Sequence, residues 1–160
     1  MFLQKAISKR IDDNNPVKVA LIGAGKFGSM FLSQVPSTKG LEVTVIADLN
    51  PENAKKACRN VGWTEDLINK TQFVDDALKA IKMSEVEVVV EATGFPPAGI
   101  EHARHSFQNG KHIVMVNVEA DVLAGSALAK EAEQAGVVYS MAYGDQPALT
   151  AEIVEWARAS

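Results

Sequence analysis

The sequence predicts an α/β fold: a doubly wound, mainly parallel sheet of about six strands with helices on both faces. Short apolar segments rich in β-branched residues recur along the 160 residues and alternate with segments of helical spacing. The apolar segments are nearly continuous, which is typical of parallel strands buried on both faces, whereas a half-exposed sheet would show polar residues at every second position. A glycine-rich turn directly follows the first of them.

The N-terminal segment is expected to form a helix, a strand and a second helix. Residues 1–11 have apolar residues at helical spacing, and the turn-forming cluster 12–16 ends that helix. The β-branched run 17–22 predicts the first strand, and residues 27–35 again show helical spacing, closed by Pro36. Phe27, Met30 and Phe31 are expected to face the core from this second helix, with Val35 as a further candidate.

The middle of the chain repeats the alternation. Residues 42–47 predict the second strand, and Pro51 opens a helix that runs to about residue 60. Residues 62–70 follow no clear pattern. A short third strand is expected at 71–74 and a helix at 75–83.

Three further strands are expected in the remainder, at residues 86–90, 111–116 and 137–140. Pro96 and Pro97 start the helix between the first two of these strands and Gly110 ends it, and a helix over 121–134 precedes the last. The closing segment 147–160 is expected to be a helix. Its apolar face consists of Leu149, Ile153, Val154 and Trp156.

The composition is that of an ordinary globular protein, with 47% hydrophobic and 22% charged residues and a net charge of −4. No basic field is present, so no nucleic-acid partner is expected. No run of about 18 apolar residues occurs, so no membrane span is expected. Cys58 is the only cysteine, which excludes an internal disulfide and, together with the lack of a signal peptide, favours a cytoplasmic location.

The strongest motif is Gly23-Ala-Gly-Lys-Phe-Gly28, between the first strand and the following helix. Gly23 permits a tight turn, Gly25 allows the backbone to approach a pyrophosphate, and Gly28 allows the helix to pack on the strand. Free N–H groups of that helix, beginning at Lys26 and Phe27, would stabilise the phosphate charge. The motif predicts a Rossmann-type dinucleotide site; the alternative is a glycine turn without a ligand.

Asp48 ends the second strand about 20 residues beyond the last motif glycine, where a carboxylate can accept hydrogen bonds from the adenosine ribose. It would repel a 2′-phosphate, and no arginine follows in residues 48–51 to offset that effect. The cofactor is therefore expected to be NAD, with NADP left open.

Polar residues also follow the later strands at the carboxyl edge of the sheet, where ligands of open α/β sheets bind. Thr93 and Gly94, in the segment after Glu91, would let the backbone pass near the ribose and nicotinamide, and a plain tight turn is the alternative. Asn117 and Glu119 follow the fifth strand. Residues 144–146 follow the sixth and include Asp145.

The remaining reactive side chains give weaker signals. His102 and His105 are one turn apart on a helix, but no further ligand completes a metal site, so they are expected on the surface and no metal is predicted. Cys58 lies within a helix and not on a turn at the carboxyl edge. It is not expected to be a nucleophile.

Four sequence blocks carry a family resemblance: Val19-Ala-Leu-Ile-Gly-Ala-Gly-Lys-Phe-Gly28, Val88-Val-Val-Glu-Ala-Thr-Gly94, Gly110-Lys-His-Ile-Val-Met-Val-Asn-Val-Glu-Ala-Asp121 and Gly144-Asp-Gln-Pro147. The chain resembles the N-terminal domain of homoserine-dehydrogenase-like oxidoreductases, most closely the reductoisomerase-like branch that continues into a SAF domain. The resemblance implies NAD(P) held by Gly23, Gly25, Gly28 and Thr93, with the nicotinamide near Asn117 and Glu119.

One departure from that family bears on the substrate. Homoserine dehydrogenases carry an Asn-Lys pair after the fifth strand, and that lysine helps to organise the active site, whereas this chain has Asn117-Val118. The missing cation argues against homoserine oxidation itself. The reductoisomerase-like branch has Asn-Val-Glu at this place, as here, but is associated with NADPH, which Asp48 does not favour.

The preferred function is hydride transfer between a nicotinamide cofactor and a small carbonyl or hydroxy substrate, with Glu119 and Asp145 as candidate acid-base residues. The alternative is a non-catalytic NAD-sensing or assembly module. The expected organisation is an N-terminal helix (1–15), the dinucleotide-binding domain (16–146) and the start of a connection to a further domain (147–160) that supplies most substrate contacts. The fragment alone is expected to be inactive, and a homo-oligomer is left open.

Overall fold

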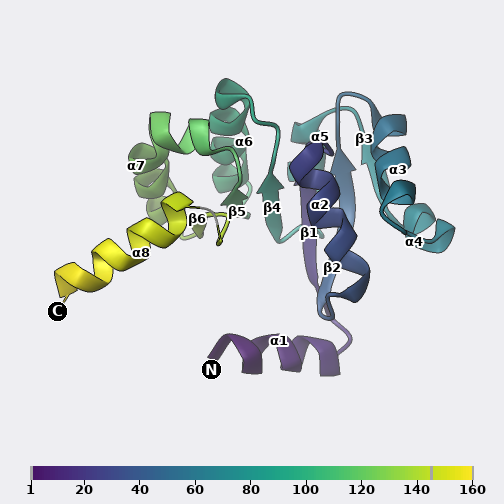
Figure 1. Cartoon of the computed structure of the whole chain (residues 1–160), viewed down its shortest axis with the longest axis horizontal. Helices are drawn as coiled ribbons and strands as arrows, with labels where there is room; N and C mark the ends of the chain where they lie inside the picture. The colour runs from purple at the N-terminus through teal and green to yellow at the C-terminus, as the bar shows by residue number, and fades with distance from the viewer. Residues whose placement is uncertain (1, 145, 160) are drawn as a thin grey trace.

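The protein is a six-stranded parallel sheet with helices on both faces (Figure 1). It is described from a computed structural model that covers residues 2–144 and 146–159. The strands are β1 (Val17–Ile22), β2 (Leu41–Ala47), β3 (Gln72–Val74), β4 (Val88–Glu91), β5 (His112–Met115) and β6 (Tyr139–Met141). The helices are α1 (Phe2–Asp12), α2 (Lys26–Gln34), α3 (Pro51–Asn60), α4 (Glu65–Lys70), α5 (Ala77–Ile81), α6 (Pro96–Gln108), α7 (Val118–Ala135) and α8 (Gln146–Ala159), with a 3₁₀ turn η1 (Val35–Ser37) after α2.

The strand order is β3-β2-β1-β4-β5-β6, and every neighbouring pair is parallel. The chain winds outward from β1 to β3, then returns to place β4 on the other side of β1. This reversal leaves a crevice beyond the carboxyl ends of β1 and β4, which is where ligands bind in open α/β sheets. The predicted doubly wound sheet is confirmed.

Both faces of the sheet are buried, because alternate side chains of each central strand enter different clusters. Ala20 and Ile22 of β1 pack with α5, α6 and α7, while Val19 and Leu21 pack with α2, α3 and α4. Side chains of a strand alternate between the two faces, so burial on both sides requires an apolar residue at nearly every position. This is the physical reason for the unbroken apolar runs in the sequence.

Helix α2 turns a different face to the sheet from the one expected. Gly28, Leu32 and Val35 are buried, whereas Phe27 is 36% and Met30 54% exposed. The inward placement of these two side chains was therefore wrong. The buried face of α2 includes Gly28 because the helix backbone lies close to the end of β1 and the Gly23 carbonyl at that point. No larger residue fits there.

Several boundaries also differ from those expected. Residues 65–70, which showed no clear pattern, form α4, capped by the Thr64 side chain, which accepts a hydrogen bond from the N–H of Leu67. Helix α7 begins at Val118, three residues earlier than expected, because Asn117 caps its first turn. The other elements agree with the expected ones apart from their ends.

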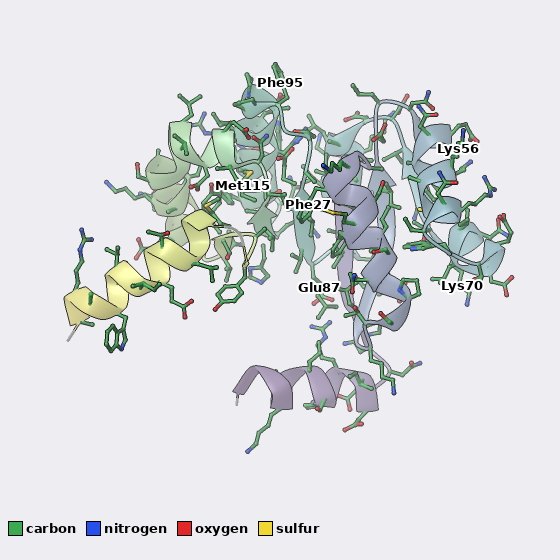
Figure 2. All side chains as sticks on the ribbon, viewed as in Figure 1. Phe27, Lys56, Lys70, Glu87, Phe95 and Met115 are labelled. Carbon is green, nitrogen blue, oxygen red and sulfur yellow. The ribbon has the colours of Figure 1, made fainter. Side chains whose placement is uncertain are left out.

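The two terminal helices lie outside the layered core (Figure 1). Helix α1 lies below the amino ends of the strands. Ile7 and Ile11 approach Gly40, and Arg10 makes an ion pair with Glu87, which points toward this helix in Figure 2. Helix α8 extends away from β6, and its expected apolar side chains are exposed, from 38% at Leu149 to 72% at Trp156. None of the described helices has the length and hydropathy needed to cross a membrane.

Candidate functional site

The glycine turn between β1 and α2 is held by close backbone contacts. Gly23 has φ +92°, and a Cβ there would lie 2.8 Å from the carbonyl oxygen of Ala92. A Cβ on Gly28 would lie 2.3 Å from the carbonyl oxygen of Gly23. Neither position accepts a side chain without displacing backbone, so both glycines are needed for β1, β4 and α2 to approach one another.

Gly25 differs from these two, since a Cβ there would meet no atom within 4 Å. It is exposed and occupies the N-cap of α2 with φ −70°, a backbone angle that other residues also adopt. No side chain caps the helix. The N–H groups of the first turn, at the positive end of the helix dipole, are therefore left without a side-chain cap.

Asp48, at the end of β2, ties this turn to the neighbouring strand. Its carboxylate accepts a 2.9 Å hydrogen bond from the N–H of Ala24 and another of 2.9 Å from the N–H of Asn50. A carboxylate has about four acceptor positions, so two remain for a ligand. Asp48 thus supports the glycine turn and still offers acceptors beside it.

A cavity of about 730 Å³ opens at this edge of the sheet. Its walls come from the ends of β1 and β2, the start of α5, the turn after β4 and the first two turns of α6: Ile22, Gly23, Gly25, Ala47, Asp48, Leu49, Asp75, Asp76, Ala77, Leu78, Ala92, Thr93, Phe95, Ala98, Glu101 and His102. The volume lies in the range of small-molecule and cofactor pockets. The structure brings together four predicted cofactor residues here: Gly23, Gly25, Asp48 and Thr93.

The other predicted residues that the structure describes are not in the cavity lining. Lys26 and Phe27 are exposed on the first turn of α2, and Gly94 is exposed in the turn after β4 with φ +69°. Asn117 is only 2% exposed and caps α7, whose first turn carries the exposed Glu119. Asp145 lies outside the described residues.

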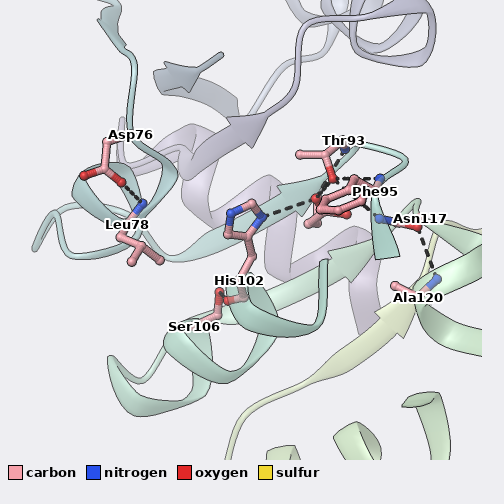
Figure 3. A network of polar contacts seen from close by, with 9 residues as sticks. Asp76, Leu78, Thr93, Phe95, His102, Ser106, Asn117 and Ala120 are labelled. Carbon is pink, nitrogen blue, oxygen red and sulfur yellow. Dashed lines mark hydrogen bonds and ion pairs between the residues drawn. The ribbon is translucent and has the colours of Figure 1, made fainter. Parts of the chain in front are cut away.

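A buried polar network lies behind the turn that follows β4 (Figure 3). Glu91 is completely buried, and its Oε1 accepts hydrogen bonds from the Thr93 hydroxyl at 2.5 Å and the Thr93 N–H at 3.3 Å. His102 Nδ1 lies 3.3 Å from the same oxygen. The Thr93 hydroxyl oxygen in turn accepts from the N–H of Phe95 and from Nδ2 of Asn117.

The sequence-based placement of His102 was also wrong. It was expected on the surface, yet it is only 9% exposed and lies between Glu91 and the cavity. Helical spacing could have indicated this burial. Residue 102 lies on the same face of α6 as Gly99, Ala103 and Ser106, which are buried. His105, one turn on, is half-buried beside Glu101.

Cys58 and the possible metal ligands were the remaining candidates for reactive chemistry. Burial raises the pKa of the Cys58 thiol to about 11, which keeps it protonated and unreactive on α3. In the described part of the chain, no three His, Cys, Asp or Glu side chains gather as a metal site would require.

A known protein family matches this chain over all six strands of the sheet. Residues 17–143 match a family described as an oxidoreductase family with an NAD-binding Rossmann fold. The chain is 26% identical over 132 residues to the homoserine dehydrogenase of Neisseria gonorrhoeae, covering 77% of this chain and 28% of that protein.

Two solved structures are similar in fold. A homoserine dehydrogenase from Thiobacillus denitrificans superposes with a TM-score of 0.66 and 21% identity, over 79% of this chain and 29% of that one. A levoglucosan dehydrogenase in complex with NADH and L-sorbose gives a TM-score of 0.61 and 24% identity, over 79% of this chain and 34% of that one. This chain therefore spans about a third or less of these relatives.

Proposed function

The chain belongs to the oxidoreductase family with an NAD-binding Rossmann fold, and we propose that the cavity at its carboxyl edge binds NAD in one orientation. The pyrophosphate lies at Gly25, the adenosine extends toward Asp48 and the nicotinamide extends toward Thr93. The observation that carries this proposal is the open backbone of Gly25 in the cavity wall, directly beside the two glycines that admit no side chain.

The pyrophosphate position follows from charge and space. The uncapped N–H groups of α2 and its positive dipole end stabilise an anion, and nothing fills the volume in front of Gly25. Lys26, exposed on the same turn, adds a positive charge. These features fit a diphosphate.

The charge of the cavity supports NAD over NADP. Asp48 is accompanied by Asp75 and Asp76 in the wall on the adenosine side, and no Lys or Arg is among the described residues that line the cavity. Lys79 pairs with Asp75, which leaves the carboxylates of Asp48 and Asp76 to repel a 2′-phosphate, whereas free ribose hydroxyls can donate to Asp48.

The complete protein, on this proposal, transfers hydride between the nicotinamide and a small carbonyl or hydroxy compound. Glu119 remains a candidate acid-base residue because it is exposed at the start of α7, and Asp145 remains one on sequence grounds alone. Residues 16–146 form the cofactor domain, after an N-terminal helix (1–15). Residues 147–160 begin the connection to a substrate-binding domain.

Three narrower assignments belong to the proposal. The segment Asn117-Val118-Glu119 supports the reductoisomerase-like branch with a SAF domain, which the sequence encoded beyond residue 160 would test. A cytoplasmic location would be tested by cell fractionation. A homo-oligomer would be tested by sedimentation of the complete protein.

Calorimetric titration with NAD, NADH, NADP and NADPH tests the proposal. The chain is expected to bind the NAD forms more tightly than the NADP forms. Gly25→Val should abolish binding while the protein stays folded, since a side chain there meets open space and φ is ordinary. Ser33→Val, on an exposed part of the same helix, is the matched control. Four flat titrations of the folded chain would refute the proposal.

A further inference from the structure

Glu91 stands out because its burial is costly. The last residues of the neighbouring strands in this register, Ile22 and Met115, are apolar, yet β4 ends in a carboxylate with no exposed surface. Its Oε2 has no hydrogen-bond partner among the described residues, and His102 is the titratable side chain paired with Oε1. Burial of a carboxyl group is unfavourable unless both oxygens are paired, so the end of a strand alone does not explain why Glu91 is here.

Glu91 fixes the direction of the hydrogen bonds that the Thr93 hydroxyl can make. A threonine hydroxyl has one proton to donate, and Glu91 Oε1 accepts it. The N–H of Phe95 at 3.3 Å and Nδ2 of Asn117 at 3.5 Å both approach the same hydroxyl oxygen as donors. Every partner in the structure therefore leaves Thr93 as an acceptor, and these last two bonds are long enough for a ligand donor to compete with them.

The sheet order decides which part of a dinucleotide meets Thr93. β1, with the glycine turn, lies between β2, which carries Asp48, and β4, which leads to Thr93. A cofactor with its pyrophosphate at Gly25 and its adenosine at Asp48 must direct its nicotinamide half toward Thr93. That half carries the donors that an acceptor needs, in the ribose hydroxyls and the carboxamide NH₂, whereas phosphate oxygens carry none.

We propose that Glu91 is a positioning residue: by holding the proton of the Thr93 hydroxyl, it makes Thr93 an acceptor that recognises the nicotinamide half of the cofactor. This inference rests on the proposed function. His102, from α6, contacts the same Oε1 of Glu91 that accepts from Thr93 (Figure 3), and it also lines the cavity.

The test compares NADH with ADP-ribose, which has the adenosine and pyrophosphate but not the nicotinamide. The chain is expected to bind NADH more tightly than ADP-ribose. Thr93→Val should reduce that preference roughly tenfold, the size of one good hydrogen bond, with ADP-ribose affinity nearly unchanged. Thr38→Val, an exposed threonine at the opposite edge of the sheet, is the control.

Glu91→Leu should produce the same loss of preference, and the double variant with Thr93→Val should lose no more than either one, because both act through one hydroxyl. Glu91→Gln, whose amide oxygen can replace Oε1, should regain part of the preference. If Glu91→Leu does not fold, the preference for NADH over ADP-ribose is compared between the wild type, Thr93→Val and Glu91→Gln.

The outcomes separate this inference from the proposed function. If the wild-type chain binds neither ligand, the proposed function fails. If it binds NADH but Thr93→Val leaves the preference over ADP-ribose unchanged, the positioning role is overturned and the proposed function stands. Additive losses in the double variant, equal losses for both ligands, or a Glu91→Gln variant no better than Glu91→Leu would also overturn it.

Discussion

Asp48 has two tasks at the residue scale. It accepts a hydrogen bond from the N–H of Ala24, which holds the glycine turn, and it presents its remaining acceptor positions to the cavity. A carboxylate accepts stronger hydrogen bonds than a neutral amide, and its charge adds repulsion against a phosphate. A substitution that removes the charge and keeps one oxygen leaves a single acceptor for the N–H groups of Ala24 and Asn50.

Asp48→Asn is therefore expected to lose about 1 kcal/mol of stability through one missing backbone hydrogen bond, to bind NADH roughly tenfold more weakly, and to discriminate less against NADPH. Titration calorimetry with both cofactors measures these changes. Asp66→Asn, on the exposed side of α4, removes the same charge away from the cavity and should change neither affinity. An undiminished preference for NADH in Asp48→Asn would show that this charge does not select the cofactor.

The sequence predicted individual residues well where one local rule decides their role. The spacing of Gly23, Gly25 and Gly28 after a strand predicted a turn in which two glycines admit no Cβ and the third faces open space, as the structure has it. Glu91 and His102 could not be paired in this way. Their contact joins a strand end to a helix 11 residues later and depends on how α6 packs on the sheet.

At the element scale, the sequence did not correctly predict which face of helix α2 packs on the sheet. Helical spacing in α2 fitted two faces, one with Phe27 and Met30 and one with Gly28 and Leu32, and hydrophobicity alone favoured the first. The close approach of α2 to the turn decides for the second, because a Cβ at Gly28 would clash with the Gly23 carbonyl oxygen. The short α4 and the early start of α7 depend on caps at Thr64 and Asn117.

The ion pair that attaches α1 to the sheet should make the stability of the fold depend on pH. Arg10 donates hydrogen bonds of 2.8 and 2.6 Å to the carboxylate of Glu87, just before β4. Burial by itself would raise the pKa of Glu87, but the hydrogen bonds from Arg10 and from the N–H of Lys18 outweigh it and lower the pKa below its ordinary value near 4.5. The ion pair therefore stabilises the fold above that pH, and its contribution is lost as the pH falls through the lowered pKa.

Arg10→Met should lower the free energy of unfolding by about 0.5 to 1 kcal/mol at pH 7, a small value because both side chains are partly exposed. The difference from the wild type should shrink as the pH is lowered below 4.5. Urea unfolding at several pH values measures it. Lys9→Met, which removes an exposed pair with Asp13, the residue after α1, serves as the comparison. A difference that persists unchanged at low pH would exclude the ion pair as its cause.

For the whole molecule, the six-stranded parallel sheet and its reversal between β1 and β4 were predictable because both faces of every central strand are buried. The family match confirms an NAD-binding oxidoreductase domain, and the likeness to homoserine dehydrogenases agrees with the sequence blocks that suggested it. The catalytic residues could not be predicted to the same degree. Glu119 is exposed and outside the cavity lining, and this chain spans only 28% to 34% of the relatives' length.

The central claim is that a nicotinamide dinucleotide lies across the glycine turn with its diphosphate at Gly25. Backbone amide NMR of the chain during titration with NADH tests this claim most directly. The largest shifts are expected at residues 23–28, at Asp48 and at residues 93–95. Shifts confined to the separate cavity lined by Lys55, Arg59 and Thr71, with residues 23–28 unmoved, would contradict it.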